Sequence, residues 1–149
     1  MKKWAQKQTG FTIVELLIVV VTIAILAAIT IVAYNGIQAK SRDAARDSAA
    51  KSIRTALELY KSDNADTYPN ACGTVNTGCS SAQLAGSLVP KYIASIPSDP
   101  VAGTTIDYVV GTGQIGYGLL VNYQSKPKCK FLVGSSTNSG WWGSGIPVC

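Results

Sequence analysis

Hydrophobic positions near the start of the chain form one uncharged block. Residues 16–39 contain no charged side chain, and residues 16–33 are almost wholly aliphatic. A helix rises about 1.5 Å per residue, so this block is long enough to cross most of the roughly 30 Å hydrocarbon core of a bilayer. The pattern predicts a membrane-spanning helix with one carboxylate, Glu15, directly ahead of the block.

The polar pattern changes after this block but remains helical. No proline or glycine occurs from Ile37 to Lys61, and charged residues recur there at spacings of three and four. The pattern predicts one helix from Phe11 to about Ser62, roughly 75–80 Å long. The charged stripe consists of Lys40, Asp43, Asp47, Lys51, Arg54, Glu58 and Lys61. We interpret this stripe as a solvated face rather than a specific contact with another subunit.

The opposite face of this helix carries mostly small side chains. Small residues let a sheet approach a helix closely, so we expect this face to pack on a sheet. Its members are Ile37, Ala45, Ser48, Ala49, Ser52, Ile53, Ala56, Leu59 and Tyr60.

Beyond Ser62 the chain becomes rich in turn-forming residues, and strand patterns follow. Residues 64–104 are predicted to be mainly loop, with one short helix capped by Ser80 or Ser81 and stopped by Pro90. Strands are predicted at residues 105–110, 117–123 and 129–134, joined by short connections. The predicted fold class is therefore α+β, with a long N-terminal helix packed on a small antiparallel sheet of about three strands.

Composition narrows the chemistry that the chain can perform. The formal net charge is +5, and three lysines lie in the first ten residues. There is no histidine, no G-x-S-x-G sequence and no clustered pair of acids, so we predict no catalytic residues, metal site or cofactor. The run Gly111-Thr112-Gly113-Gln114-Ile115-Gly116 matches a dinucleotide fingerprint on paper, but a strand pattern follows it, so we predict a hairpin turn.

A short basic cluster lies near the C-terminus. Lys126, Lys128 and Lys130, together with the Trp141-Trp142 pair, are residue types that bind nucleic acid through charge and base stacking. DNA is a weak candidate partner, and we favour a solvated loop with a packed or exposed tryptophan pair.

The apolar block follows a Gly10-Phe11 junction that ends a basic segment. A secretory signal has a shorter apolar core with its cleavage site after it, whereas the candidate site here lies before the core. The run Lys7-Gln8-Thr9-Gly10-Phe11-Thr12-Ile13-Val14-Glu15-Leu16-Leu17 resembles the class III signal of type IV prepilins and pseudopilins. The resemblance implies a membrane peptidase that cuts between Gly10 and Phe11 and N-methylates Phe11.

The same resemblance divides the chain into three parts. Residues 1–10 are the prepilin leader, and residues 11–35 are the hydrophobic transmembrane and assembly half of the helix. Residues 36–149 are a globular domain that includes the amphipathic half of the helix. Many type IV pilins carry a helix-breaking proline in the apolar segment, whereas this chain has none there. Its first residues that favour bending of the helix are Asn35 and Gly36, because glycine lowers helix stability. Helix continuity near Gly36 in a filament therefore stays open.

Glu15 needs an explanation because it borders the apolar block. An acid at the centre of a membrane helix costs roughly 2.5–3.5 kcal/mol, and less near an interface, so a partner is expected. The family resemblance places that partner at the α-amine of Phe11 on an adjacent filament subunit, which would form an assembly salt bridge. The alternative is that Glu15 snorkels to the headgroups and interacts with the positive end of the helix dipole.

Four cysteines lie beyond the apolar block, which suits an oxidising compartment. Three pairings are possible. We favour Cys72 with Cys79, which bracket a short loop, and Cys129 with Cys149, which would tie the last strand to the chain end. The second pair resembles the C-terminal disulfide loop of type IVa pilins. A zinc site is the weaker alternative because the chain has no histidine and no C-x-x-C spacing.

The resemblance implies a structural subunit rather than an enzyme. We predict a type IV pilin, assembled into a surface filament for adhesion, twitching motility or DNA uptake. The alternative is a pseudopilin of a type II secretion or competence system. Secretion pseudopilins usually carry an acid-rich calcium loop near the C-terminus, and no acid follows Asp107 here. A third possibility is a signal-anchored membrane protein that binds a ligand without polymerising.

The expected partners follow from the same resemblance. They are further copies of the chain and other pilins in a helical filament, the prepilin peptidase, the membrane, and the assembly platform with its ATPase. We expect the protein as a single-pass subunit in the cytoplasmic membrane before assembly and on the cell surface afterwards.

Overall fold

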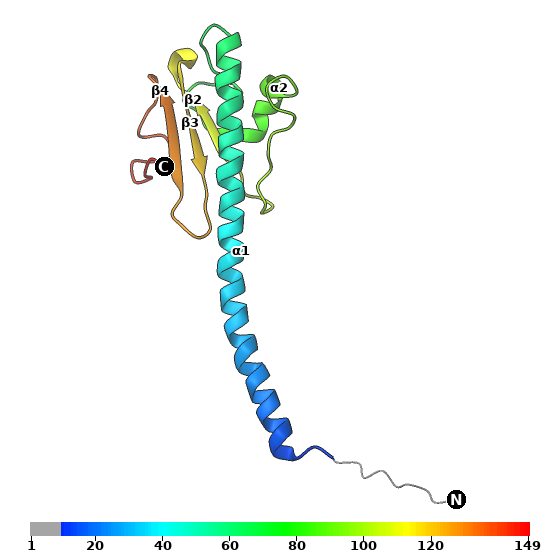
Figure 1. Cartoon of the computed structure of the whole chain (residues 1–149). Helices are drawn as coiled ribbons and strands as arrows, with labels where there is room; N and C mark the ends of the chain where they lie inside the picture. Colours follow the sequence, from blue (N-terminus) through cyan, green and yellow to red (C-terminus); the bar gives the residue numbers. More distant parts are fainter. Residues whose placement is uncertain (1–9) are drawn as a thin grey trace, which may run out of the picture. The chain divides into compact units, whose positions relative to one another are not determined.

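The computed structural model describes residues 10–149, so residues 1–9 of the predicted leader, with its three lysines, lie outside the described residues. The chain divides after Gln38 into two compact units, of which the second, Ala39–Cys149, is called the head below. One helix, α1 (Ile13–Asp63), contributes to both units (Figure 1). Gly36 lies within this helix, and the helical assignment continues through it.

The bounds of α1 agree with the predicted helix to within two residues at each end. The helix stops after Asp63 because the chain turns there. The side-chain amide of Asn64 donates to the Tyr60 carbonyl at 2.7 Å, and Ala65 and Asp66 adopt left-handed φ values of 51° and 58°. An open carbonyl of the last turn thereby gains a donor.

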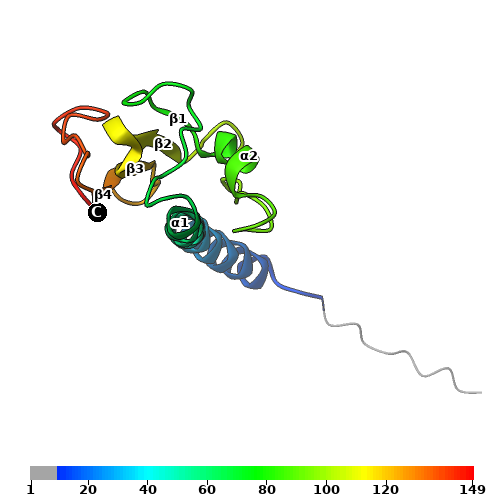
Figure 2. The ribbon, with the colours of Figure 1, turned by 90° about the horizontal axis from the view of Figure 1, so that it is seen from above.

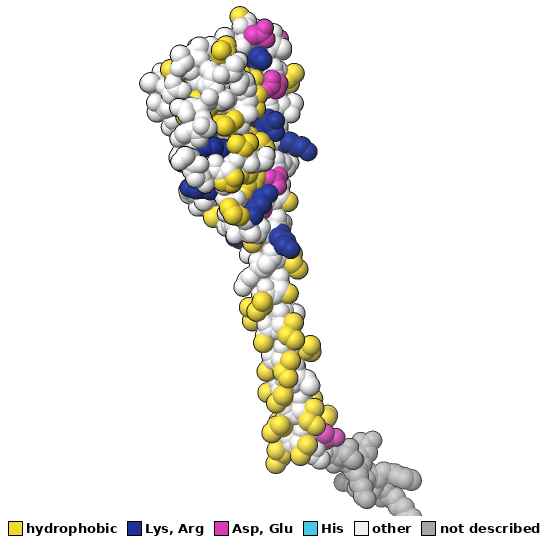
Figure 3. All heavy atoms as spheres, turned by 90° about the vertical axis from the view of Figure 1, so that its left-hand side faces the viewer, with side chains coloured by type: hydrophobic (Ala, Val, Ile, Leu, Met, Phe, Trp, Pro, Cys, Tyr) yellow, Lys and Arg dark blue, Asp and Glu magenta, His cyan; other side chains and the backbone are white. Residues whose placement is uncertain are grey.

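The first unit presents apolar side chains on all sides of the helix. Its aliphatic residues are about half exposed or more, as at Leu16 (64%) and Ile29 (63%). This part of α1 is long and apolar enough to cross a membrane, and Figure 3 shows its surface covered with hydrophobic side chains. Such a surface requires lipid or neighbouring helices to cover it.

The head contains a four-stranded antiparallel meander in the order β1-β2-β3-β4. The strands are β1 (Cys79–Ser80), β2 (Asp107–Val110), β3 (Gly116–Val121) and β4 (Cys129–Gly134). The three predicted strands are present, and the register pairs Tyr108 with Leu119 and Leu119 with Phe131. β1 is an additional edge strand of two residues that pairs with β2 and that no residue pattern predicted.

The short elements around the sheet match the turn chemistry of the sequence. A 3-10 turn, η1 (Ser81–Leu84), runs into α2 (Ala85–Leu88), and Ser80 Oγ accepts a hydrogen bond from the Ala82 amide at 3.3 Å. The glycine run after β2 forms η2 (Thr112–Gln114), with Gly113 at φ 71°, and leads directly into β3. The run is therefore a hairpin connection, as predicted, and not the start of a helix.

The core lies where the head portion of α1 covers one face of the sheet (Figure 2). Ile53 and Leu57 of α1 are fully buried against Tyr108 and Tyr117 of the sheet, and Leu88 of α2 closes the cluster. The Tyr68 and Tyr117 rings meet edge to face with centroids 4.6 Å apart, an arrangement that aromatic quadrupoles favour.

The predicted inward face of α1 is partly wrong. Ile37, Ala45, Ser48, Ser52 and Leu59 are exposed, whereas Ile53 and Ala56 are buried as predicted. The other buried residues of α1 are Asp43, Arg46, Ala50 and Leu57. The sequence analysis placed Asp43 on a solvated stripe because it assumed that charged side chains of the helix are exposed. The two charged residues are buried because they bind each other and a third charged group, as described below.

Candidate functional site

The junction at the start of α1 brings together the residues that the sequence singled out. Gly10 and Phe11 precede the helix in non-helical conformation, and Phe11 is 90% exposed. Glu15 lies in the first turn of α1. The Gly10-Phe11 bond is thus presented outside regular structure, which suits a peptidase substrate.

Glu15 binds Thr12 in a reciprocal capping box. The Thr12 amide donates to Glu15 Oε2 at 2.9 Å, the Thr12 hydroxyl donates to the same oxygen at 2.8 Å, and the Glu15 amide donates to Thr12 Oγ1 at 3.2 Å. This arrangement satisfies backbone donors at the helix start. Thr12 was not singled out from the sequence, although its T-x-x-E spacing is the signature of such a box.

The capping box leaves part of the Glu15 carboxylate available. All three hydrogen bonds with Thr12 use Oε2 or the amide, and none uses Oε1. Within residues 10–149, the ion pairs found do not include Glu15. One carboxylate oxygen is therefore held in place while the other is open to a cation from outside the subunit.

The hydroxyl groups within the apolar segment are already bonded. Thr22 donates to the Val19 carbonyl at 2.9 Å, and Thr30 donates to the Leu26 carbonyl at 2.7 Å. Their donors therefore need no partner from lipid or from another helix. This part of α1 can pack on apolar neighbours through methyl and methylene groups.

A buried ion cluster holds the head portion of α1. Arg46 is 1% exposed, and its guanidinium binds Asp99 through Nε at 2.7 Å and Nη2 at 2.8 Å. Its Nη1 donates to Asp43 Oδ1 at 3.0 Å. We call Asp43, Arg46 and Asp99 the Arg46 clamp. The two-point bond to Asp99 uses the fork geometry that distinguishes arginine from lysine.

Both carboxylates of the Arg46 clamp receive further hydrogen bonds. Asp43 accepts from the Gln124 and Ser125 amides at 2.8 Å each and from the Ser125 hydroxyl at 2.6 Å. Burial acts to raise the pKa of Asp43, but the hydrogen bonds from Ser125, Gln124 and Arg46 outweigh it and lower the pKa to about 2. The clamp thus joins α1 to the loop between β3 and β4.

Asp99 is held in a similar way on the other side of Arg46. Its carboxylate accepts from the Val101 amide at 2.8 Å and the Thr104 hydroxyl at 2.6 Å. The hydrogen bond from Arg46 is the main cause that lowers the pKa of Asp99 to about 2, and burial opposes it. The clamp therefore joins α1 to the loop ahead of β2 as well.

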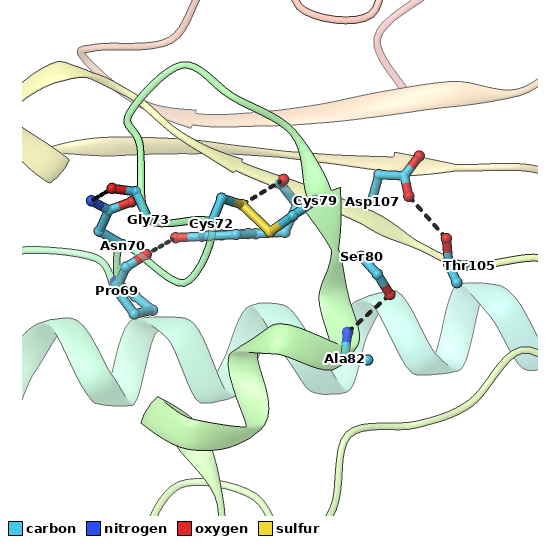
Figure 4. Close-up of a disulfide and its surroundings, with 10 residues drawn as sticks. Pro69, Asn70, Cys72, Gly73, Cys79, Ser80, Ala82, Thr105 and Asp107 are labelled. Carbon is cyan, nitrogen blue, oxygen red and sulfur yellow. Dashed lines mark hydrogen bonds between the residues drawn. A yellow bond between two sulfur atoms is a disulfide. The ribbon is translucent and has the colours of Figure 1, made fainter.

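The four cysteines form two disulfides, in the pairs that the sequence favours. Cys72 is bonded to Cys79, with Cα atoms 5.5 Å apart, and Cys129 is bonded to Cys149, with Cα atoms 5.1 Å apart. Figure 4 shows the first disulfide beside the loop of Pro69 and Asn70, where Pro69 O accepts a hydrogen bond from the buried Tyr108 hydroxyl at 2.8 Å. The first bridge fixes the start of β1 to this loop.

The C-terminal segment is fixed on β4 by more than its disulfide. Lys130 of β4 is 2% exposed, and its ammonium donates to the carbonyls of Ser139 (2.5 Å), Trp141 (3.2 Å) and Gly143 (3.1 Å). The backbone of Lys130 also pairs with the chain end, because the Cys149 amide donates to its carbonyl at 3.0 Å. An ammonium has three donors, and here each reaches one carbonyl.

This geometry removes most of the candidate DNA surface. Lys130 is buried, and Trp141 is 7% exposed. Trp141 and Trp142 pack over Gly118 of β3, where an added Cβ would lie 2.9 Å from each ring. Lys126 and Lys128 remain exposed, but the structure does not combine them with an open aromatic platform.

Known proteins share both the N-terminal segment and most of the chain. Residues 5–34 match the family model described as the prokaryotic N-terminal methylation motif. The type II secretion system core protein G of Escherichia coli (strain K12) is 35% identical over 124 residues, which cover 76% of this chain and 80% of that protein. The protein of the same name from Klebsiella michiganensis is 32% identical over 120 residues, with 74% and 79% coverage. No solved structure matches the chain.

Proposed function

The chain belongs to the type IV pilin and pseudopilin family, and we propose that it is a pseudopilin, a structural subunit of a filament in a type II secretion or related system. The sequence analysis preferred a surface pilin and kept the pseudopilin as the alternative. The relatives favour that alternative, because both are named as type II secretion core proteins and the similarity covers the head as well as the methylation motif. This similarity carries the proposal.

The sequence argument against a pseudopilin was the lack of acids after Asp107. In this chain the corresponding segment is held by the Cys129–Cys149 disulfide and by the Lys130 ammonium. These contacts order the C-terminal segment through covalent and hydrogen-bonded links of its own. The missing acids are therefore a weak argument against this branch of the family.

The N-terminal junction supplies the assembly step of the proposed function. Cleavage between Gly10 and Phe11 would remove the leader lysines and create an α-amine at Phe11. Glu15 Oε2 accepts hydrogen bonds from Thr12, and Oε1 can accept a hydrogen bond from the Phe11 amine of an adjacent subunit. At about 4 Å and an effective dielectric constant of about 20, two such charges attract by roughly 4 kcal/mol. The exposed aliphatic residues of α1 would then pack against neighbouring helices in place of lipid.

The substitution Glu15→Gln tests the pairing directly. It keeps the size of the side chain and one carbonyl oxygen for Thr12 but removes the negative charge. We expect normal cleavage and methylation at Phe11, measured by intact mass, together with a large loss of subunit from assembled filaments, measured by chemical crosslinking of neighbouring subunits. Glu58→Gln is the matched control, because Glu58 is an exposed acid of the head that accepts from the Tyr68 hydroxyl. Wild-type filament yield for Glu15→Gln would contradict the assembly role.

Deletion in the native host separates the candidate functions. A pseudopilin is required for protein secretion, so deletion should abolish release of secreted proteins into the medium. Loss of surface filaments with intact secretion would instead indicate a surface pilin. A chain that retains Met1 and remains monomeric would indicate the signal-anchored alternative.

A further inference from the structure

One end of the head carries four cations, of which Lys126 alone is in an ion pair found within residues 10–149. Lys40 and Arg42 lie in α1 at the start of the head, and Lys126 and Lys128 lie in the loop between β3 and β4. We call these four residues the basic end. Lys40, Lys126 and Lys128 are exposed, and Arg42 is half-buried.

Specific contacts bring the two parts of the basic end together. The Gln124 and Ser125 amides donate to the Asp43 carboxylate at 2.8 Å, directly beside Arg42 in the chain. Arg42 Nη1 also donates to Gln124 Oε1 at 3.4 Å. The loop that carries both lysines is therefore attached to the first turns of α1 in the head, and the four cations belong to one surface.

The charge of this surface is only partly compensated. The acids beside it are Asp43, which is buried against Arg46, and Asp47, which accepts from the Tyr123 hydroxyl and pairs with Lys126 at 3.4 Å. Within residues 10–149, Lys40, Arg42 and Lys128 take part in none of the ion pairs found. On the face drawn in Figure 3, most Lys and Arg side chains of the head lie in its middle and lower parts, with an acidic side chain among them.

The position of the basic end in the chain identifies its partner. The uncharged block ends at Ala39, and Lys40 is the next residue. Tyr34, six residues earlier, is an aromatic residue of the kind enriched at membrane–water interfaces. A bilayer that accommodates the uncharged block therefore has its headgroups at the level of Lys40 and Arg42. Cations close to an anionic leaflet are attracted to its headgroups, and the attraction falls off within a Debye length.

We propose that the basic end binds anionic phospholipid headgroups and holds the head on the membrane surface while the subunit resides in the membrane. This binding requires membrane insertion of α1 and does not require a filament. It is therefore independent of the choice between pilin and pseudopilin. It would keep inserted subunits in one orientation before assembly and would be released on extraction.

The test uses the full chain at one copy per nanodisc. A water-soluble acetylating reagent is applied at single-hit dose, and modification of each lysine is measured by peptide mass spectrometry. We expect Lys128 to react at least about threefold more slowly in discs that contain phosphatidylglycerol than in discs of phosphatidylcholine alone, and high salt to remove the difference. Lys91 is the internal control, because its side chain is 66% exposed and pairs with Asp63 at the last residue of α1.

A charge variant tests whether Lys40 and Arg42 contribute to the surface that protects Lys128. The double substitution Lys40→Gln/Arg42→Gln should lower the protection of Lys128 in anionic discs, whereas Lys91→Gln should leave it unchanged. Equal Lys128 reactivity in neutral and anionic discs would overturn the proposal. Protection that arises only with several subunits per disc would also overturn it and would assign the surface to a neighbouring subunit.

Discussion

The Arg46 clamp predicts a large and local loss of stability when its arginine is removed. Arg46→Met keeps most of the side-chain length but leaves two buried carboxylates without their shared cation. Breaking a buried pair by removing one partner typically costs 3–5 kcal/mol. Asp43 keeps three hydrogen-bond donors and Asp99 keeps two, so we expect the lower part of this range, about 3 kcal/mol.

The assay is thermal and urea unfolding of the full chain in detergent micelles. Near-UV circular dichroism of the tryptophans reports on the head, since Trp141 and Trp142 pack on Gly118 of its sheet. For a domain of roughly 100 residues, a loss of about 3 kcal/mol corresponds to a fall in Tm of roughly 10–15 °C. Arg46→Lys should be intermediate because an ammonium cannot reproduce the two-point bond to Asp99.

Arg42→Met is the matched control for this prediction. Arg42 lies one turn earlier on α1 and makes only a 3.4 Å contact with Gln124, at a partly exposed site. Its replacement should change the free energy of unfolding by less than about 0.5 kcal/mol. If Arg46→Met lost less than about 1 kcal/mol, or no more than Arg42→Met, the clamp would not stabilise the head and the reasoning from burial would be refuted.

Three further predictions concern the head. Asp43 and Asp99 have pKa values lowered to about 2, so their stabilisation is complete above pH of about 4 and should be lost as pH falls toward about 2, by roughly 2 kcal/mol for each. Urea unfolding at a series of acid pH values measures this loss, and a free energy of unfolding that stays constant between about pH 5 and about pH 2 would contradict it. Lys130→Met leaves three carbonyls without their donor and should lower the free energy of unfolding by about 2–4 kcal/mol. It should also expose Trp141 and Trp142 to iodide quenching, and an unchanged quenching profile would refute the role of the ammonium. Gly118→Ala places a methyl 2.9 Å from the Trp141 ring and should lower stability by about 1–3 kcal/mol, and a neutral effect would show that the ring can move freely.

Some elements of the fold could be predicted from the sequence because they depend on residues close together in the chain. The absence of proline and glycine from Ile37 to Lys61 specifies the head portion of α1, and turn residues after Ser62 end it. Short runs rich in apolar and aromatic residues, bounded by turn residues, predicted the three longer strands, and their short connections predicted the meander. Cys129 and Cys149 flank the final segment, so their pairing required only that the chain end return to the last strand.

Other features depend on contacts between distant residues, which a residue pattern does not contain. Arg46 is buried because Asp99 lies 53 positions later in the chain and reaches its guanidinium. Lys130 is buried because three carbonyls of the final segment surround its ammonium. β1 has two residues, too few for any periodicity, and pairs with Tyr108 of β2 next to the Cys72–Cys79 disulfide. Thr12 differs from these, because its capping pattern was present in the sequence.

The Arg46 clamp and the basic end share Asp43, and this sharing links fold to function. The Asp43 carboxylate neutralises Arg46 and also holds the loop that carries Lys126 and Lys128. The four cations are therefore positioned before any lipid is bound, so binding need not order a flexible loop. Arg46→Met changes no exposed charge, yet it should lower both the stability of the head and the protection of Lys128, because the loop loses part of its attachment. Lys40→Gln/Arg42→Gln should lower the protection alone. If Lys128 kept its protection after the clamp was broken, attraction to the membrane would depend on total charge and not on the fixed surface described here.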